Sequence, residues 1–243
     1  RMIFMIEIDG SYKEAGGQIL RTSLGLSALS GKSFKITKIR AGRCNPGIRP
    51  QHLEAIKSVA ELCNAKVIDA KIGSAELEFY PGKMKSGKIK INIPTAGSVG
   101  LVLQGLMIAA VNIEKPIDIE IVGGATNGKW AAPVNYIKFV LLPILEKMGY
   151  NGNINIKKYG YYPKGGAIVD AKIEPSKLRS INILEQGKTL SLFGISHASS
   201  QLKKSNVSER QKDMAQKILS DKFEINPKID TQYNDTVCPG SAI

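Results

Sequence analysis

The chain has 243 residues, of which 43% are hydrophobic, and its formal net charge is +13 at pH 7. This length and apolar content exclude a disordered tail and allow one large domain or a domain with a smaller neighbour. The positive charge favours an anionic partner, for which RNA, DNA and nucleotides are the natural candidates. The longest apolar run contains Gln104 and is shorter than a bilayer span, so we expect a soluble, cytoplasmic protein with no membrane partner.

The three cysteines are widely spaced and form no pattern typical of a zinc site or a disulfide framework. Cys63 falls at the apolar spacing of a helix and is expected in the core. Cys44 lies beside arginines, which favours a more reactive thiol. A reducing, intracellular setting fits this cysteine usage.

The first predicted elements alternate between helices and strands. Apolar residues recur with helical spacing over 18–29, and Gly31 is placed as a C-terminal cap. A strand is expected over 34–39, and Pro50 opens a second helix after a Gly/Pro-rich loop. Three further strands are expected over 66–72, 75–80 and 88–93.

The same order of elements then begins again. The second pass has helices over 98–113 and 133–148, and strands over 117–122, 154–158 and 167–173. Corresponding positions, such as Pro50 and Pro133, lie about 80 residues apart. The sequence therefore predicts an α+β fold of α/β-type repeats, with two-helix, four-strand units over about 14–94 and 95–175 packed on each other. After Pro175 the pattern changes to short strands, a polar loop and a helix over 208–219.

The stretch 15–53 is the most informative, because it carries seven cationic side chains and no acidic one. Arg21 lies in the first helix, and Arg40, Arg43 and Arg49 lie in the Gly/Pro-rich loop. A guanidinium group presents a planar fork of donors that matches phosphate oxygens. The loop therefore indicates a phosphate-binding site rather than a surface charged only for solubility.

Residues beside the arginines each have more than one interpretation. Gly16 and Gly17 precede a helix whose free N–H groups would suit an anion, or they simply allow a tight turn. Glu14 either holds a divalent metal or pairs with an arginine. Gln51 and His52 lie in the first turn of the second helix, where His52 is a proton donor, a phosphate ligand or, as is commonest, a surface histidine.

The second unit offers fewer charged groups. The segment TAGSVGLVLQG places glycine and serine before a helix in which Gln104 is the single amide. A buried amide there needs partners, which a nucleobase or the backbone of the other repeat could supply. The loop GGATNGKWAAP contributes Lys129 but no arginine cluster, and His197, without charged neighbours in sequence, is expected to be structural.

Six segments together resemble the RNA 3′-terminal phosphate cyclases, in the same order and with similar spacing: DGSYKEAGGQILR, IRAGRCNPGIRPQHL, TAGSVGLVLQ, GGATNGKWAAPVNY, YYPKGG and CPGSAI. The resemblance covers nearly the whole chain. It implies a repeated-unit core over 1–180 and a smaller inserted α/β domain that starts near Ile181 and is incomplete at 243.

Members of that family use ATP and a divalent metal, Mg or Mn, to adenylate a histidine, and then pass AMP to the 3′-phosphate of an RNA. The neighbouring 2′-hydroxyl closes a 2′,3′-cyclic phosphate and expels AMP. The family's adenylated histidine lies in a C-terminal segment that no residue of this chain matches, so we expect the natural protein to extend beyond Ile243.

The resemblance also implies roles for individual residues. The positions that would grip the phosphates of the RNA or the nucleotide are Arg21, Arg40, Arg43 and Gln51. His52 would lie within reach of a phosphate, and Glu14 would help to hold the metal. Gln104 and Pro133 would line the adenosine pocket.

Two other classes of function stay open. One is a non-catalytic RNA-binding relative, as among the cyclase-like proteins of ribosome assembly. The pattern around Glu14 and Arg21 argues against this class, because such a protein has no chemical need for it. The unmatched histidine segment argues for this class. An enzyme of small anionic metabolites would need fewer excess cations. The metal preference, the acceptance of DNA ends and a homo-oligomer also stay open.

Overall fold

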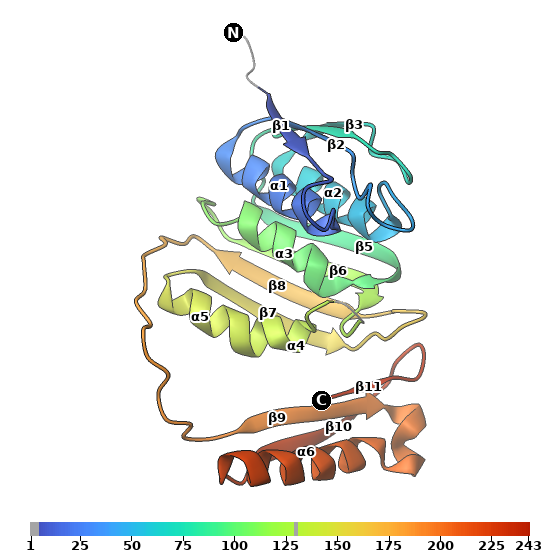
Figure 1. Cartoon of the computed structure of the whole chain (residues 1–243), viewed down its shortest axis with the longest axis vertical. Helices are drawn as coiled ribbons and strands as arrows, with labels where there is room; N and C mark the ends of the chain where they lie inside the picture. The colour runs from blue at the N-terminus through green and yellow to red at the C-terminus, as the bar shows by residue number, and fades with distance from the viewer. Residues whose placement is uncertain (1–4, 129–130) are drawn as a thin grey trace.

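The computed structural model describes residues 5–128 and 131–243, which form two α/β units followed by a third, smaller sheet (Figure 1). The first unit contains β1 (Ile6–Asp9), α1 (Gly17–Ser30), β2 (Phe34–Thr37), α2 (Pro50–Cys63), β3 (Lys66–Ile68) and β4 (Leu77–Tyr80). Its sheet has the order β1-β2-β4-β3, with β1 and β2 parallel and the other pairs antiparallel. As predicted, α1 ends at Gly31, whose φ of 70° suits glycine.

The second unit repeats this arrangement. It contains β5 (Gly87–Ser98), α3 (Val99–Ala109), β6 (Ile117–Ala125), α4 (Val134–Tyr136), the π-helix η1 (Ile137–Leu141), α5 (Leu142–Lys147), β7 (Asn151–Lys158) and β8 (Ile168–Glu174). Its sheet has the order β5-β6-β8-β7, again with one parallel pair followed by antiparallel pairs. The shared topology confirms the α+β fold of repeated units.

One strand was assigned to the wrong unit. The sequence placed the strand at 88–93 at the end of the first repeat, but β5 pairs in parallel with β6 and opens the second sheet. The corresponding place in the first sheet belongs to β1, which was not predicted. Each unit is therefore β-α-β-α-β-β. The division into a core over 1–180 and a smaller domain after it stays a prediction.

The helix predicted over 133–148 contains a π segment, and Pro143 gives the physical reason. Proline has no N–H to donate, and its ring would meet the carbonyl of Phe139 in a regular α-helix. The wider turn of η1, which lies just before Pro143, relieves that contact.

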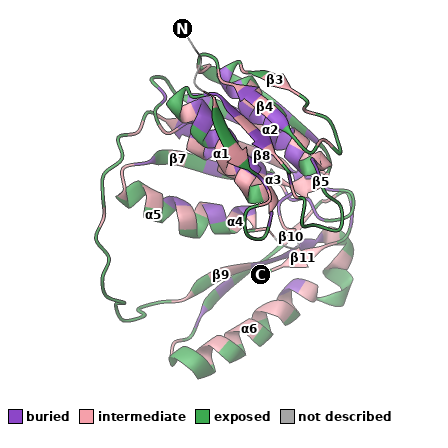
Figure 2. Cartoon of the chain, turned by 45° about the horizontal axis from the view of Figure 1, so that its top comes forward, coloured by how far each residue is buried: buried purple, intermediate pink, exposed green. Residues whose placement is uncertain are grey.

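One continuous hydrophobic core joins the two units. The helix α3, nearly all apolar, packs against both α1 and α2 (Figure 2). Close packing of α1 on α3 needs Gly25, where a Cβ would be 2.8 Å from the Cβ of Ile108. This contact between units brings the N-terminal ends of their helices into one region.

The third sheet consists of β9 (Phe193–Ser199), β10 (Lys228–Asn234) and β11 (Ser241–Ala242) in the order β10-β9-β11. A short 3₁₀-helix, η2 (Ser200–Ser205), precedes α6 (Val207–Phe223), which packs on β9 and β10 (Figure 1). Residues 175–192 contain neither helix nor strand, so the strands expected directly after Pro175 begin only at Phe193. Within the two described ranges, no helix is both long and apolar enough to cross a bilayer.

Candidate phosphate-binding site

The N-terminal ends of α1 and α2 lie against each other. A Cβ at Gly17, the first residue of α1, would be 2.0 Å from Nε2 of His52 in the first turn of α2. Neither helix has an acidic residue in its first turn. The positive ends of two helix dipoles therefore lie together without a negative side chain of their own, an arrangement that favours an anion.

Arg21 lies one turn inside α1 and is 8% exposed. Its Nε has no hydrogen-bond partner among the described residues, and no described carboxylate forms an ion pair with it. Burial lowers the pKa of Arg21. Because an uncompensated buried guanidinium costs stability, its presence indicates a group kept for binding an anion.

Arg40 organises the loop that contains the other arginines, residues 38–49, here called the arginine loop. Its Nη1 donates hydrogen bonds to the carbonyls of Asn45 and Gly47, the latter at 3.2 Å. The pKa of Arg40 is lowered first by burial and then by the charges of Arg49 and Arg43, which therefore lie close by. Three arginines share this loop, and one of them shapes its backbone.

The arginine loop is anchored to the first unit at Gly47. A Cβ there would be 2.4 Å from the carbonyl oxygen of Gly73, and φ is 77°, so the position requires glycine. The next residue, Ile48, is 0% exposed and its N–H donates to the carbonyl of Ser74. Sequence reasoning missed this anchor, although the turn-forming pair Pro46-Gly47 was a signal for it.

Glu14 forms an ion pair with an arginine of the arginine loop, which was one of the two interpretations of this residue. Its Oε2 lies 3.7 Å from Nη2 of Arg43, and its side chain is 92% exposed. No group of three or more His, Cys, Asp or Glu gathers among the described residues. A lone carboxylate nevertheless suits Mg²⁺ that is held mainly by nucleotide phosphates, so Glu14 fits a single-ligand role.

His52 is not the surface histidine expected as its commonest fate, because it is 1% exposed. Its Nδ1 accepts a hydrogen bond from the N–H of Arg49 at 3.1 Å, and its Nε2 faces Gly17. Burial first, and then the charges of Arg21, Arg40 and Arg49, lower the pKa of His52 to about 4. The ring is therefore neutral at pH 7, and it caps α2 and spaces α2 from α1.

Gln51 lies close to the second unit. Its side chain is exposed at the start of α2, and its Cβ would be 3.7 Å from a Cβ at Gly97. Gly97 directly precedes Ser98, whose hydroxyl accepts from the N–H of Leu101 and so caps α3. A third helix N-terminus thus lies next to the first two.

Gln104 and Pro133, the predicted adenosine pair, lie on α3 and at the N-cap of α4, respectively. Gln104 is half-buried and follows Gly100 by one helical turn on the same face. A Cβ at Gly100 would be 2.7 Å from the carbonyl of Ala132, the residue before Pro133. The amide of Gln104, considered as a buried group from the sequence, belongs to a residue that is only partly buried. Lys129 lies outside the described residues.

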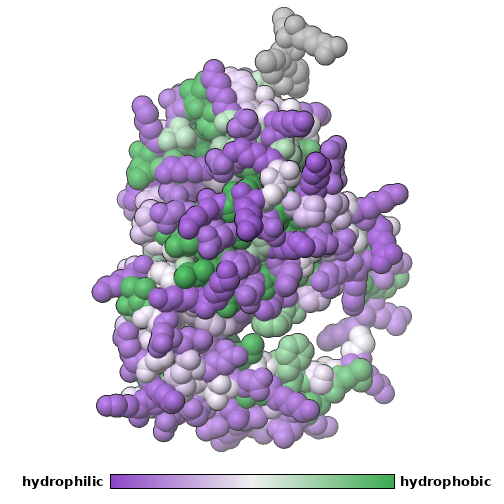
Figure 3. Space-filling view, turned by 180° about the vertical axis from the view of Figure 1, so that it is seen from behind, coloured by the Kyte–Doolittle hydropathy of each residue, from purple (hydrophilic) through white to green (hydrophobic). Residues whose placement is uncertain are grey.

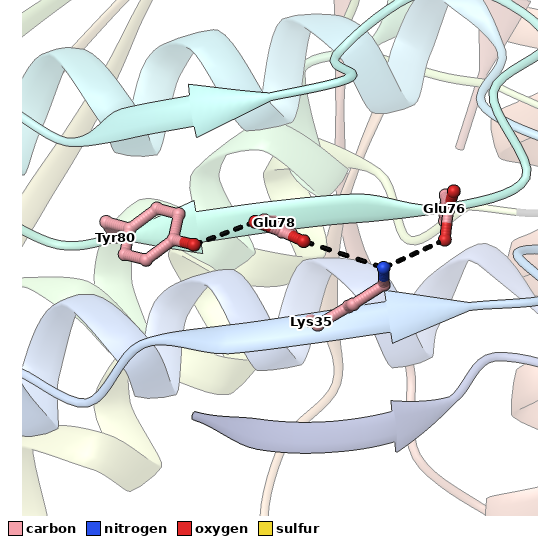
Figure 4. Close-up of polar contacts among 4 residues, drawn as sticks. All are labelled: Lys35, Glu76, Glu78 and Tyr80. Carbon is pink, nitrogen blue, oxygen red and sulfur yellow. Dashed lines mark hydrogen bonds and ion pairs between the residues drawn. The ribbon is translucent and has the colours of Figure 1, made fainter. Parts of the chain in front are cut away.

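The outer faces of the two sheets are a poor alternative for binding phosphate. On the first sheet, Nζ of Lys35 lies 3.2 Å from Glu76 and 3.5 Å from Glu78, and the Tyr80 hydroxyl donates to Glu78 at 2.7 Å (Figure 4). The second sheet carries a groove of about 660 Å³. That groove has four lysines and three acids in its lining: Lys88, Lys90, Lys157, Lys172, Asp118, Glu120 and Asp170. Matched charges of this kind are typical of solvated faces.

Comparisons with known proteins identify the family of the chain. The sequence profile of the RNA 3′-terminal phosphate cyclase family matches residues 12–242. The chain is 45% identical to the RNA 3′-terminal phosphate cyclase of Thermococcus gammatolerans over 98% of this chain and 68% of the relative. It is 46% identical to the cyclase of Methanococcoides burtonii over 98% of this chain and 70% of the relative. Matches of this extent, over a fold of repeated units, show that the chain belongs to the RNA 3′-terminal phosphate cyclase family.

Proposed function

We propose that the arginine site holds the 3′-terminal phosphate of an RNA, and that the protein converts it to a 2′,3′-cyclic phosphate with ATP and Mg or Mn. The observation that carries the proposal is Arg21, a residue 8% exposed with no carboxylate partner among the described residues, beside the first turns of two helices. Phosphate is the anion that guanidinium forks and helix N-termini both suit. We propose RNA as the substrate because the matched relatives are named RNA 3′-terminal phosphate cyclases.

The chemistry requires activation, because a phosphate oxygen is a poor leaving group. In the proposed sequence AMP passes from ATP to a histidine, with release of pyrophosphate, and then from the histidine to the RNA 3′-phosphate. The 2′-hydroxyl attacks the RNA phosphorus, the bond from that phosphorus to the AMP oxygen breaks, and AMP leaves with the electron pair. The hydroxyl proton passes to solvent or a base.

The residues of the chain divide this work. Arg21, Arg40 and Arg43 would neutralise charge on the phosphoryl oxygens, which grows as the leaving group departs. Gln51 would reach the same phosphates from the start of α2. A divalent metal held in part by Glu14 would supply further positive charge to the nucleotide phosphates.

Gln104 and Pro133 would form the wall that receives the adenine. The contact between Gly100 and Ala132 supports this role, since it places one face of α3 beside the start of α4. The half-buried amide of Gln104 can donate to and accept from a base edge.

The adenylated histidine is neither His52 nor His197. Each is 1% exposed, and the Nδ1 of each is already in a hydrogen bond. An attacking imidazole needs an accessible ring nitrogen, so we assign adenylation to a histidine other than these two.

We further propose a cytoplasmic location, in keeping with three free cysteines and an RNA substrate. The partners are then the RNA end and ATP. A homo-oligomer stays a prediction.

An end-labelled RNA with a 3′-phosphate tests the proposal on the protein expressed from its complete gene. With ATP and Mg²⁺ we expect a product that resists phosphatase, and mass spectrometry should find an AMP adduct on a histidine. Arg21→Met should abolish the product, whereas Arg210→Met, at an exposed arginine of α6, should not. RNA binding without product or adduct would instead favour the non-catalytic class.

A further inference from the structure

Among the described residues, the third sheet meets the second unit at a small buried cluster that is separate from the main core. Tyr159 and Tyr161, which follow β7, and Cys238, which precedes β11, form this cluster with exposures of 8%, 4% and 5%. The space-filling view shows an opening in the lower part of the molecule, with hydrophobic atoms at its rim (Figure 3). The contact is therefore local.

His197 of β9 lies at the centre of the cluster. It is 1% exposed, its Nδ1 lies 2.6 Å from the Tyr161 hydroxyl, and its ring stacks on Tyr159 with centroids 4.2 Å apart. Burial lowers the pKa of His197 to about 4 and raises that of Tyr161. Both groups are neutral at pH 7, so the hydrogen bond holds one proton, which belongs to the hydroxyl or to Nδ1 according to the tautomer of His197.

The loop before β11 closes over Tyr161 from the other side. The Sγ of Cys238 donates to the Tyr161 carbonyl at 3.2 Å. A Cβ at Gly240 would be 2.1 Å from Cγ of Tyr161, so the ring lies directly on that backbone. Tyr161 is held between β9 and the residues that lead into β11.

The cluster also reaches the start of α4. The side-chain amide of Asn135 donates to the Tyr159 hydroxyl at 3.2 Å. Asn135 lies two residues after Pro133 and two residues before Ile137, where the π-helix η1 begins. A movement of β9 can thus change the support of α4 through His197 and Tyr159.

The segment that connects the second unit to the third sheet has no regular secondary structure. Residues 175–192 contain no helix or strand, and Leu184 and Leu190 in that segment are 85% and 89% exposed. Opening the cluster therefore exposes a few side chains and does not require the main core to unfold.

We propose that Tyr159, Tyr161, His197 and Cys238 form a latch between the third sheet and the second unit, and that His197 positions the start of α4 through Tyr159 and Asn135. The inference rests on the proposed function only in its last step, where α4 supports the adenosine pocket at Pro133. His197 is then a positioning residue that touches no substrate.

Labelling of the free thiols with a maleimide measures opening of the latch in the intact chain. Cys44 is exposed and should react at once. Cys238 is 5% exposed within the latch and should react only when it opens, whereas Cys63, 0% exposed in the main core, reports unfolding of the core. The ratio of the Cys238 and Cys63 rates separates the two events.

Tyr161→Phe removes only the hydroxyl that is hydrogen-bonded to His197. We expect it to speed labelling of Cys238 about three- to tenfold, the factor that loss of one neutral hydrogen bond gives, with no change at Cys63. Tyr162→Phe, at a neighbour that is 77% exposed, is the matched control and should change neither rate. Equal Cys238 rates in the two variants, or a parallel rise at Cys63, would overturn the latch.

Two substitutions of His197 test the coupling to α4. Asn keeps an acceptor near the position of Nδ1 but has no ring to stack on Tyr159, and Ala lacks both. Both variants should raise hydrogen exchange over residues 134–141 at least threefold, while only His197→Ala should speed labelling of Cys238. Unchanged exchange over 134–141 in His197→Ala would overturn the coupling. Because no readout needs a nucleotide, a failure to bind ATP would count against the proposed function and not against the latch.

Discussion

Replacing Arg21 by Met should make the unliganded protein more stable. Methionine keeps an unbranched chain of similar length and removes the charge. In the wild-type chain Arg21 is 8% exposed, its Nε is unpaired among the described residues, and burial lowers its pKa. The substitution therefore removes a desolvation cost without removing a described ion pair.

The size of the effect follows from these observations. A buried donor left without an acceptor costs about 1–3 kcal/mol, and apolar replacement of buried charge is often stabilising by about 1–4 kcal/mol. We expect Arg21→Met to add about 1–3 kcal/mol to the free energy of unfolding. For a chain of this size, each kcal/mol raises Tm by about 2–4 °C, so the rise should be about 2–12 °C.

Thermal unfolding with and without inorganic phosphate, at constant ionic strength, is the assay. Phosphate at 100 times its Kd should stabilise the wild-type protein by about 2.7 kcal/mol and Arg21→Met hardly at all. Arg210→Met, at an exposed arginine, should behave as wild type in both conditions. A less stable Arg21→Met that still gains stability from phosphate would refute the reasoning, since Arg21 would then be a structural group.

Three further predictions follow from the geometry of the site. Gly17→Ala puts a Cβ 2.0 Å from Nε2 of His52 and should cost about 1–3 kcal/mol in urea unfolding, whereas Gly16→Ala, with its nearest contact at 3.6 Å, should cost less; equal costs would contradict the close contact. Arg40→Lys loses the fork that holds the loop carbonyls, so trypsin should cleave the loop faster; an unchanged rate would show that Arg40 does not order it. His52 and His197 have folded pKa values of about 4 against an ordinary 6.5, so the unfolded chain binds more protons between these values. Stability should fall as the pH drops from about 6.5 to about 4, by about 3 kcal/mol for each histidine, and His197→Gln should show a smaller fall; the same fall in that variant would contradict the burial of His197.

Local signals predicted the helices well. The glycine after α1 and Pro50 at the start of α2 fix these helix ends by backbone chemistry alone. The repeat was also visible, because each unit has the same order of apolar patterns. By contrast, β1 was not predicted, because it has only four residues. It is held by parallel pairing with β2, from which the whole of α1 separates it in the sequence.

Non-local contacts account for most of the differences. Whether β5 joined the first or the second sheet depended on its pairing with β6, about 30 residues away, which no local pattern in 88–93 reports. The burial of His52 depends on Gly17, in another helix. A histidine in a first helical turn is usually exposed, and only the contact between the two helices makes this one a spacer.

The candidate site was partly predictable. The concentration of arginines in 15–53 indicated phosphate, and Glu14 does pair with an arginine. The sequence did not reveal that Arg40 would bind its own loop while Arg21 lacked any described partner. Those outcomes depend on which donors the fold leaves unsatisfied.

The most direct test of the central claim is the affinity of the chain for one RNA oligonucleotide carrying either a 3′-phosphate or a 3′-hydroxyl, measured by fluorescence anisotropy at several salt concentrations. A specific phosphate site predicts at least a tenfold preference for the phosphorylated end that disappears in Arg21→Met. Equal affinities with the same steep salt dependence would mean that the positive charge attracts RNA without recognising its end, and would contradict the account.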